Sequence, residues 1–302
     1  MVVDAHSHLF HHSWYPQAFN NQLAAALGRR RSTSPHAARV LLRALSDESG
    51  ESTLRAMDRA GIDRRIVLVV DWGLELGDAE LSIEAIHEAV LGICRRFSDR
   101  LAGFAGVDPR RPEAADLLGW AFDELGARGL KLHPTSASWT LHDERTLRLV
   151  DLAAQRGLVV LVHVGETFPG LVDRNASPRD LLTLAERFPE VTFVGGHAGF
   201  RRWREFGADG PLPPNLLLDI SGWQSLDDGG DAFARELLEI LRRFPGQVVF
   251  GTDSPFFGLP GSDADSRWRT RVGEVLALAS EPLGESFFDH PLLRLPMEEL
   301  VR

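Results

Sequence analysis

Residues 158–162 read Leu-Val-Val-Leu-Val, a run of five aliphatic side chains that predicts one β-strand ending just before His163. A helical pattern, with apolar residues three and four positions apart, precedes this run over residues 146–153, and another follows it over 181–188. A strand between two amphipathic helices is the repeating unit of a parallel sheet. The stretch therefore predicts a parallel α/β fold.

Seven further short apolar runs lie on either side, separated by comparable helical patterns. The eight predicted strands are residues 2–3, 65–70, 101–107, 129–132, 158–162, 191–194, 216–220 and 248–250. Eight such units favour a closed barrel over an open doubly wound sheet, since right-handed crossovers close at that number. An open nucleotide-binding sheet would also need a glycine-rich phosphate loop after the first strand, where this chain has Asp4-Ala5-His6-Ser7-His8. We therefore predict a single (β/α)8 TIM-barrel domain over residues 1–302.

Composition narrows the class of protein. The chain has 302 residues, of which 44% are hydrophobic and 25% are charged, as in ordinary globular proteins. The net charge of -10 argues against nucleic-acid or anionic-membrane partners, because both need clustered Lys and Arg. The single cysteine, Cys94, lies in an amphipathic pattern and is expected in the core. Without a signal-peptide pattern or an apolar stretch of about 18 residues, we expect a cytoplasmic protein.

The connection after the first strand is longer than a βα unit needs. About 55 residues separate the first two strands, and residues 10–46 combine aromatic side chains with a helical Ala/Leu pattern. This insertion, about 10–50, leaves the carboxyl end of the first strand, which is the catalytic face of a barrel. It is therefore predicted to form a lid or substrate wall, with Trp14 as a substrate contact. A purely structural helical excursion is the alternative.

Polar side chains follow the apolar runs, and in a barrel such positions converge on one mouth. They are His6, His8, Lys131, His133, His163, His197 and Asp253. In His6-Ser7-His8 both imidazoles share one face of a strand, because side chains alternate, so both can face one ion. Imidazole and carboxylate suit Zn²⁺ and other borderline metals. We predict one divalent metal ion, with Zn²⁺ as the expected ion and Mn²⁺ or another divalent ion as the alternative.

Three of these residues also have structural interpretations. His163 would then be a satisfied core histidine, Asp253 a turn or helix-capping residue before Pro255, and His197 a turn histidine between small neighbours. Their joint occurrence at strand ends of one barrel favours the functional interpretation over the structural one.

Five ordered pieces of the sequence carry a family resemblance. They are Val3-Asp4-Ala5-His6-Ser7-His8, Gly129-Leu130-Lys131-Leu132-His133-Pro134, Val162-His163, Gly196-His197-Ala198-Gly199 and Phe250-Gly251-Thr252-Asp253-Ser254-Pro255-Phe256. Together they resemble the amidohydrolase superfamily, in the branch related to aminocarboxymuconate-semialdehyde decarboxylase. The resemblance implies that His6, His8 and His163 bind the metal and that Asp253 binds it or the water on it. It also implies that His197 polarises the substrate or shuttles a proton.

Lys131 has two interpretations within this resemblance. Some superfamily members carry a carbamylated lysine at the end of the fourth strand that bridges two metals, but residues 129–134 look more like the mononuclear branch. We expect an ordinary catalytic lysine that binds an anionic substrate group or orients the surroundings of Asp253. His133 shares its strand face and is expected in the substrate pocket. Arg201 is expected to clamp a substrate carboxylate, with a solvated helix start as the alternative.

The leading functional hypothesis is hydrolysis of an amide, lactone, imide or related acyl bond in a small molecule. A metal lowers the pKa of bound water from about 15.7 toward about 7, Asp253 can accept its proton, and His197 can stabilise the oxyanion. The alternative is metal-dependent, non-oxidative decarboxylation of an aromatic or unsaturated carboxylic acid. A non-enzymatic binding barrel is disfavoured by the acid and base groups. The expected partner is a small molecule, anionic if Lys131 and Arg201 contact it, and a homodimer is left open.

Overall fold

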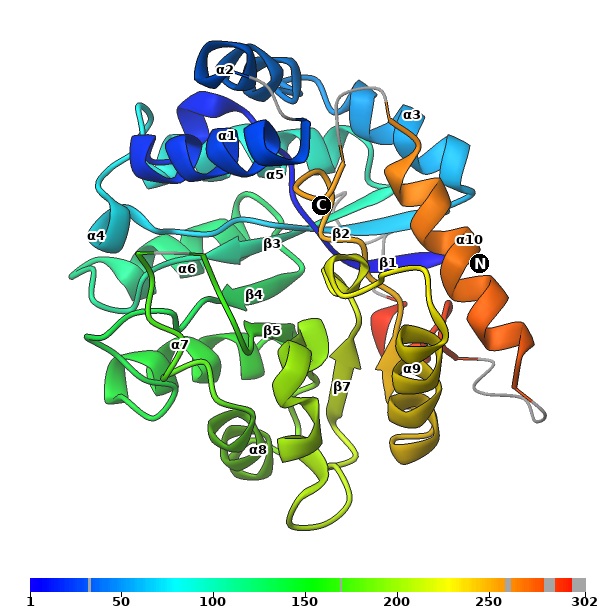
Figure 1. Ribbon diagram of the computed structural model, residues 1–302. Helices are drawn as coiled ribbons and strands as arrows, with labels where there is room; N and C mark the ends of the chain where they lie inside the picture. The colour runs from blue at the N-terminus through cyan, green and yellow to red at the C-terminus, as the bar shows by residue number, and fades with distance from the viewer. Residues whose placement is uncertain (32–33, 169, 259–261, 280–285, 295–302) are drawn as a thin grey trace.

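The computed structural model describes residues 1–31, 34–168, 170–258, 262–279 and 286–294. Eight parallel strands follow one another around a single sheet in chain order, and helices surround them (Figure 1). The strands are β1 (Val3–Ser7), β2 (Arg64–Leu68), β3 (Leu101–Gly106), β4 (Gly129–Leu132), β5 (Val159–His163), β6 (Phe193–Gly196), β7 (Leu216–Asp219) and β8 (Val248–Val249). Backbone hydrogen bonds from Ala5 to Phe250 and from His8 to Ser254 bring β1 beside the end of β8. The predicted (β/α)8 barrel is confirmed.

The helices that alternate with the strands cover the outside of the barrel. They are α3 (Glu51–Ala60), α5 (Ile83–Arg96), α6 (Ala114–Asp123), α7 (Glu144–Ala154), α8 (Pro178–Arg187), α9 (Asp231–Arg243) and α10 (Ala264–Ala277). Shorter elements occupy the loops: η1 (His12–Trp14), α4 (Gly73–Leu76), η2 (His197–Gly207), η3 (Trp223–Ser225) and η4 (Pro291–Leu293). Among the described residues no helix has both the length and the apolar character needed to cross a bilayer. Cys94 is buried on α5, as its pattern predicted.

The insertion after β1 forms two further helices, α1 (Gln17–Arg31) and α2 (Pro35–Ala44). They pack against each other near the top of Figure 1. Ser34 caps α2, its hydroxyl accepting a hydrogen bond from the Ala37 amide, and Pro35 occupies the first turn, where a missing amide proton costs nothing. The insertion is therefore helical over most of its described length.

Alternating side chains sort into two buried layers. Val159 and Leu161 belong to a cluster that gathers alternate residues from most of the strands, whereas Val160 and Val162 belong to the larger layer between strands and helices. By the same alternation His163 follows Val159 and Leu161 toward the barrel axis. The apolar run that predicted this strand therefore also determines which way His163 points.

The predicted first strand, residues 2–3, was too short. Strand β1 runs from Val3 to Ser7, because the polar residues that interrupt its apolar pattern are themselves buried. Its pairing with β2 shifts register between Asp4 and Ser7, where one extra residue is accommodated. A bulge of this kind re-aims side chains. It explains how Ala5 lies in the interior cluster while the next side chain, His6, reaches the catalytic mouth.

Candidate active site

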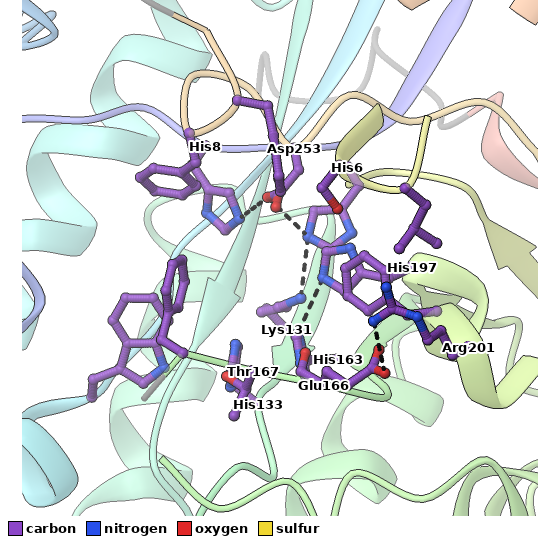
Figure 2. A pocket seen from close by; sticks show the side chains of 17 residues that line it. His6, His8, Lys131, His133, His163, Glu166, Thr167, His197, Arg201 and Asp253 are labelled. Carbon is purple, nitrogen blue, oxygen red and sulfur yellow. Dashed lines mark hydrogen bonds and ion pairs between the residues drawn. The ribbon is translucent and has the colours of Figure 1, made fainter. Parts of the chain in front are cut away.

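A cavity of about 250 Å³ opens at the carboxyl ends of the strands (Figure 2). Eight residues singled out from the sequence line it: His6, His8, Lys131, His133, His163, His197, Arg201 and Asp253. Most of the remaining wall is aromatic or aliphatic and includes Trp72, Phe168, Phe200, Phe256 and Phe257. The structure thus brings together residues that lie far apart in the sequence, from His6 on β1 to Asp253 after β8.

His6 and His8 present the same ring nitrogen to the cavity. The Nδ1 of His8 lies 2.9 Å from the carbonyl oxygen of Leu68, which can only accept, so this nitrogen carries the proton. The Nδ1 of His6 donates to Oδ2 of Asp219 at 3.0 Å. Both Nε2 atoms therefore keep a lone pair. Burial lowers the pKa of His6 to about 3, with Lys131 adding to the effect and Asp219 opposing it, so its ring is neutral at pH 7.

Asp253 completes a group of donors with these two rings. Its Oδ1 lies 3.3 Å from Nε2 of His8 and 3.7 Å from Nε2 of His6. Burial alone would raise the pKa of Asp253, but the neighbouring rings of His8, His197 and His6 outweigh it and hold the pKa below its usual range. The residue is therefore an anion facing two nitrogen lone pairs.

These three residues fit a divalent cation. Their ligand atoms lie within 4.8 Å of one another, and each histidine donates its other N–H to an acceptor, as metal-binding histidines do. A second group within the same limit joins His6, His197 and Asp219. Asp219 already accepts several hydrogen bonds, so it orients ligands rather than offering a free lone pair to an ion. The group of His6, His8 and Asp253 is thus the better metal site.

His163 and His197 face each other beside this group. The Nδ1 of His197 donates to the carbonyl oxygen of Ser221 at 2.9 Å, and Nε2 of His163 lies 3.2 Å from that of Glu166. Since carbonyls only accept, both nitrogens carry protons, and the lone pairs of His197 Nε2 and His163 Nδ1 meet at 3.0 Å. Such a pair favours a cation nearby. The role of His163 as a metal ligand stays a prediction, because both of its nitrogens face other groups here.

The backbone around His197 and Asp253 adopts the left-handed region. Among the described residues, the non-glycine residues with positive φ are His197 (58°), Ala198 (45°), Phe200 (49°) and Asp253 (53°). This conformation costs energy for residues with a Cβ atom, and it persists where surrounding contacts fix it. One such contact is the indole N–H of Trp223, which donates to the carbonyl oxygen of His197 at 2.7 Å. Both proposed acid–base residues therefore sit on strained turns at strand ends.

Asp219 is the principal site residue that the sequence reasoning missed. It is fully buried at the end of β7 and accepts hydrogen bonds from His6 Nδ1, from the His197 amide at 3.1 Å and from the Ser221 amide and hydroxyl. Burial alone would raise the pKa of Asp219, but His6 outweighs this effect and keeps the pKa below its usual range. A signal was available, because a carboxylate that ends an apolar run is costly to bury without a function.

Lys131 is buried and reaches the group of His6, His8 and Asp253 from β4. Its Nζ lies 3.5 Å from Nε2 of His6. Burial lowers the pKa of Lys131 to about 8, and the carboxylates of Asp219 and Asp253 limit the shift. The side chain is thus a cation at pH 7 that can meet a negative group at the floor of the cavity.

The predicted substrate contacts lie in different places. The ring of His133 stacks on that of His163 with centroids 4.1 Å apart. Arg201 lies at the mouth, 75% exposed, with its Nη1 3.8 Å from Oε1 of Glu166. Trp14 does not line this cavity but a separate one that shares Trp72 with it, so its role as a substrate contact stays a prediction that the cavity does not support. The sequence pattern could not foresee this, because it does not encode how an insertion folds back.

The insertion contacts the cavity wall from behind. The ring of Phe19 on α1 lies 4.5 Å from Trp72 and 5.5 Å from Phe256, measured between centroids. Phe10 and Tyr15 extend the same aromatic cluster. Aromatic pairs of this kind add about 0.5–1.5 kcal/mol beyond their buried area. Residues of the insertion therefore support two side chains that line the cavity without lining it themselves.

Comparison with known proteins gives one sequence relative of note. The chain is 27% identical over 227 residues to an adenine deaminase from Streptomyces coelicolor, covering 73% of this chain and 64% of that protein. The chain thus spans somewhat less than two thirds of the length of this curated relative.

Solved structures share the fold at low identity. A 5-carboxyvanillate decarboxylase from Novosphingobium aromaticivorans, complexed with manganese and 4-hydroxy-3-methoxy-5-nitrobenzoic acid, has a TM-score of 0.59 at 15% identity and covers 94% of this chain and 91% of its own. A probable 2-pyrone-4,6-dicarboxylic acid hydrolase from Acinetobacter baumannii, with citric acid bound, has a TM-score of 0.55 at 13% identity and covers 91% and 92%. At these identities the likeness concerns the fold.

The family model decides membership. A model described as amidohydrolase matches residues 3–281, which includes all eight strands and every residue placed at the metal-binding group. The chain therefore belongs to the amidohydrolase family.

Proposed function

We propose that the protein is a metal-dependent hydrolase that cleaves an amide, lactone, imide or related acyl bond of a small molecule. The observation that carries the proposal is the carboxylate of Asp253 beside the unprotonated Nε2 atoms of His6 and His8. This arrangement joins a proton acceptor to a set of metal ligands, as hydrolysis by activated water requires. Zn²⁺ is the proposed ion, with Mn²⁺ as the alternative, since imidazole and carboxylate accommodate both.

The residues divide the work by their protonation states. A divalent ion held by His6, His8 and Asp253 would supply Lewis acidity, which lowers the pKa of water and polarises a carbonyl group. Asp253 is an anion and can accept a proton during attack. His197 holds its Nδ1 proton against Ser221, so its Nε2 can accept a proton on the opposite side, and the protonated ring can then stabilise negative charge or pass the proton on. The strained turns fix both side chains before the substrate arrives.

The cavity suits a small substrate with an apolar part. Trp72, Phe200 and Phe256 give it apolar walls, and apolar walls strengthen electrostatic interactions by excluding water. Lys131 at the floor and Arg201 at the mouth offer positive charge to a negative group of the substrate. These features favour a small anionic substrate that carries an acyl bond beside an apolar or aromatic ring.

Decarboxylation is the second candidate, and the same two cations favour it. Lys131 and Arg201 beside aromatic walls suit an aromatic carboxylic acid as well as an anionic ester or amide. One protein of the same fold is a decarboxylase bound to a substituted benzoic acid. The two reactions use the same residues but differ in their products.

The test compares the two products directly. Metal-loaded protein is incubated in heavy-oxygen water with a panel of lactones, amides, imides and hydroxylated aromatic acids, and the products are analysed by mass spectrometry. Hydrolysis places heavy oxygen in the organic product, whereas decarboxylation removes one carboxyl group as carbon dioxide and leaves the organic product without heavy oxygen. Asp253→Asn serves as the control for this site. Turnover that is equal in Asp253→Asn, or in metal-free protein, would refute the proposal.

A further inference from the structure

We propose that Asp4 is a positioning residue that holds Asp253 in place through Thr252. The inference rests on the proposed role of Asp253 in the site. Asp4 is fully buried, and it does not line the cavity, so it acts on the site through other residues. Nothing in the comparisons assigns it a role.

Both oxygens of the Asp4 carboxylate accept hydrogen bonds from Thr252, and we call this pair of contacts the clamp. Its Oδ1 accepts from the Thr252 amide at 2.9 Å, and its Oδ2 accepts from the Thr252 hydroxyl at 2.7 Å. The same Oδ1 also accepts from the His6 amide at 3.3 Å. One carboxylate therefore ties the backbone of the His6-Ser7-His8 segment to the residue that precedes Asp253.

The clamp holds the residue that precedes the strained turn at Asp253. Asp253 has φ of 53°, and its amide donates to the carbonyl oxygen of His6 at 2.8 Å. The Thr252 hydroxyl accepts from the Ser254 amide at 3.1 Å, so it anchors the turn on both sides of Asp253. A left-handed backbone at a non-glycine residue persists only when its surroundings fix it. The buried contacts between Asp4 and Thr252 can do so, together with the hydrogen bond from the Asp253 amide to His6.

A buried cation, Arg65, pairs with the Asp4 carboxylate. Arg65 is 1% exposed, its Nε lies at ion-pair distance from Asp4 Oδ2 (2.9 Å), and its Nη2 donates to Asp265 on α10 at 2.8 Å. A charged carboxylate forms stronger hydrogen bonds than a neutral one. The pair thus supports the contacts to Thr252 from the side away from the cavity.

The test removes the Thr252 hydroxyl at constant size, and with it the hydrogen bonds to Asp4 and from the Ser254 amide. Thr252→Val deletes the hydroxyl, Thr252→Ser keeps it, and Thr146→Val is the matched control. Thr146 is a fully buried threonine on α7 whose hydroxyl donates to the carbonyl oxygen of Thr140 at 2.9 Å, away from the cavity. Zn²⁺ affinity is measured by chelator competition, and hydrogen exchange of the peptide 248–256 is measured on the metal-free protein. Neither readout needs a known substrate.

We expect Thr252→Val to bind Zn²⁺ about tenfold more weakly or worse, since outer-sphere contacts commonly contribute about 10- to 100-fold in affinity. Its peptide 248–256 should exchange faster than in the wild type. Thr252→Ser should restore both values, and Thr146→Val should match the wild type even if its thermal midpoint falls. A merely structural role would lower stability equally in both valine variants and leave the local exchange and the affinity unchanged.

Equal exchange of this peptide in Thr252→Val and Thr146→Val would overturn the inference. So would wild-type Zn²⁺ affinity in Thr252→Val. The outcome is separate from the proposed function, because a wild-type protein that binds Zn²⁺ but catalyses neither reaction would refute the function and leave the clamp standing. If the wild type bound no Zn²⁺, the exchange comparison alone would decide.

Discussion

The imidazole of His6 is held between Asp219 and the cavity, with Nδ1 donating to Oδ2 of Asp219 at 3.0 Å and both residues essentially buried. The tautomer of His6 is thereby fixed, and its Nε2 lone pair points at the proposed ion. The contact joins the first strand of the sheet, β1, to the seventh, β7. Asp219, which no sequence motif revealed, therefore orients His6, which the His6-Ser7-His8 motif did reveal.

Asp219→Asn should weaken Zn²⁺ binding by about 10- to 100-fold, because an amide neither fixes the His6 tautomer nor raises the basicity of its ring. Chelator competition measures the affinity. Asp47→Asn is the matched control, because Asp47 is also a buried carboxylate but caps α3 by accepting from the Thr53 amide. If both variants lost affinity equally, the effect would be general destabilisation rather than orientation of His6.

Acid should destabilise the metal-free protein through its buried histidines. The pKa of His6 is about 3 in the folded protein, because burial disfavours its charged form, against an ordinary 6.5 in the unfolded chain. Between these values the unfolded chain binds more protons, so the free energy of unfolding falls as the pH drops below 6.5, by up to about 1.4 kcal/mol per pH unit for one histidine. Asp4, whose pKa burial raises to about 6, opposes this trend. Urea denaturation across the pH range measures the slope.

Two variants separate the source of that slope. His6→Asn should make the loss of stability below pH 6.5 less steep, because one buried titrating ring is gone. His36→Asn should leave it unchanged, since His36 is an exposed side chain on α2. Identical slopes in the wild type and His6→Asn would contradict the prediction.

The insertion should influence substrate binding through Phe19 rather than Trp14. Phe19→Ala removes the ring that packs on Trp72 and Phe256, so the cavity wall should loosen and KM should rise or substrate preference should change. Trp14→Ala should lower the thermal midpoint with little change in KM, because Trp14 lies outside this cavity. Steady-state kinetics and thermal unfolding of both variants check this. A changed KM in Trp14→Ala and an unchanged KM in Phe19→Ala would favour Trp14 as the residue that contacts the substrate.

The strand-end residues could be predicted because barrel geometry brings such positions together whatever their separation in sequence. His163 illustrates this, since an unbroken apolar run fixed both its strand and its direction. The bulge in β1 and the left-handed turn at His197 could not be predicted, since both depend on contacts between distant strands. Asp219 was not recognised, because it ends an apolar run without belonging to a known motif. The sequence could not show that Trp14 lies outside the cavity, because the packing of an insertion is decided by tertiary contacts.

Asp253→Asn should keep the fold and much of the metal yet lose most turnover. Asparagine is nearly the same size and still offers an oxygen to a cation, but it cannot accept a proton. Removal of a general base commonly costs about 10²- to 10⁴-fold, and the loss should fall on kcat because the proton moves in the transition state.

His197→Asn provides the comparison for that variant. It should also depress kcat while leaving the group of His6, His8 and Asp253 intact. Both variants are measured at full metal occupancy, verified by elemental analysis, so that a weaker ligand set is not mistaken for lost chemistry. A kcat like that of the wild type in Asp253→Asn would exclude this carboxylate as the proton acceptor, and the base would then have to be sought among the facing rings of His163 and His197, whose lone pairs meet at 3.0 Å.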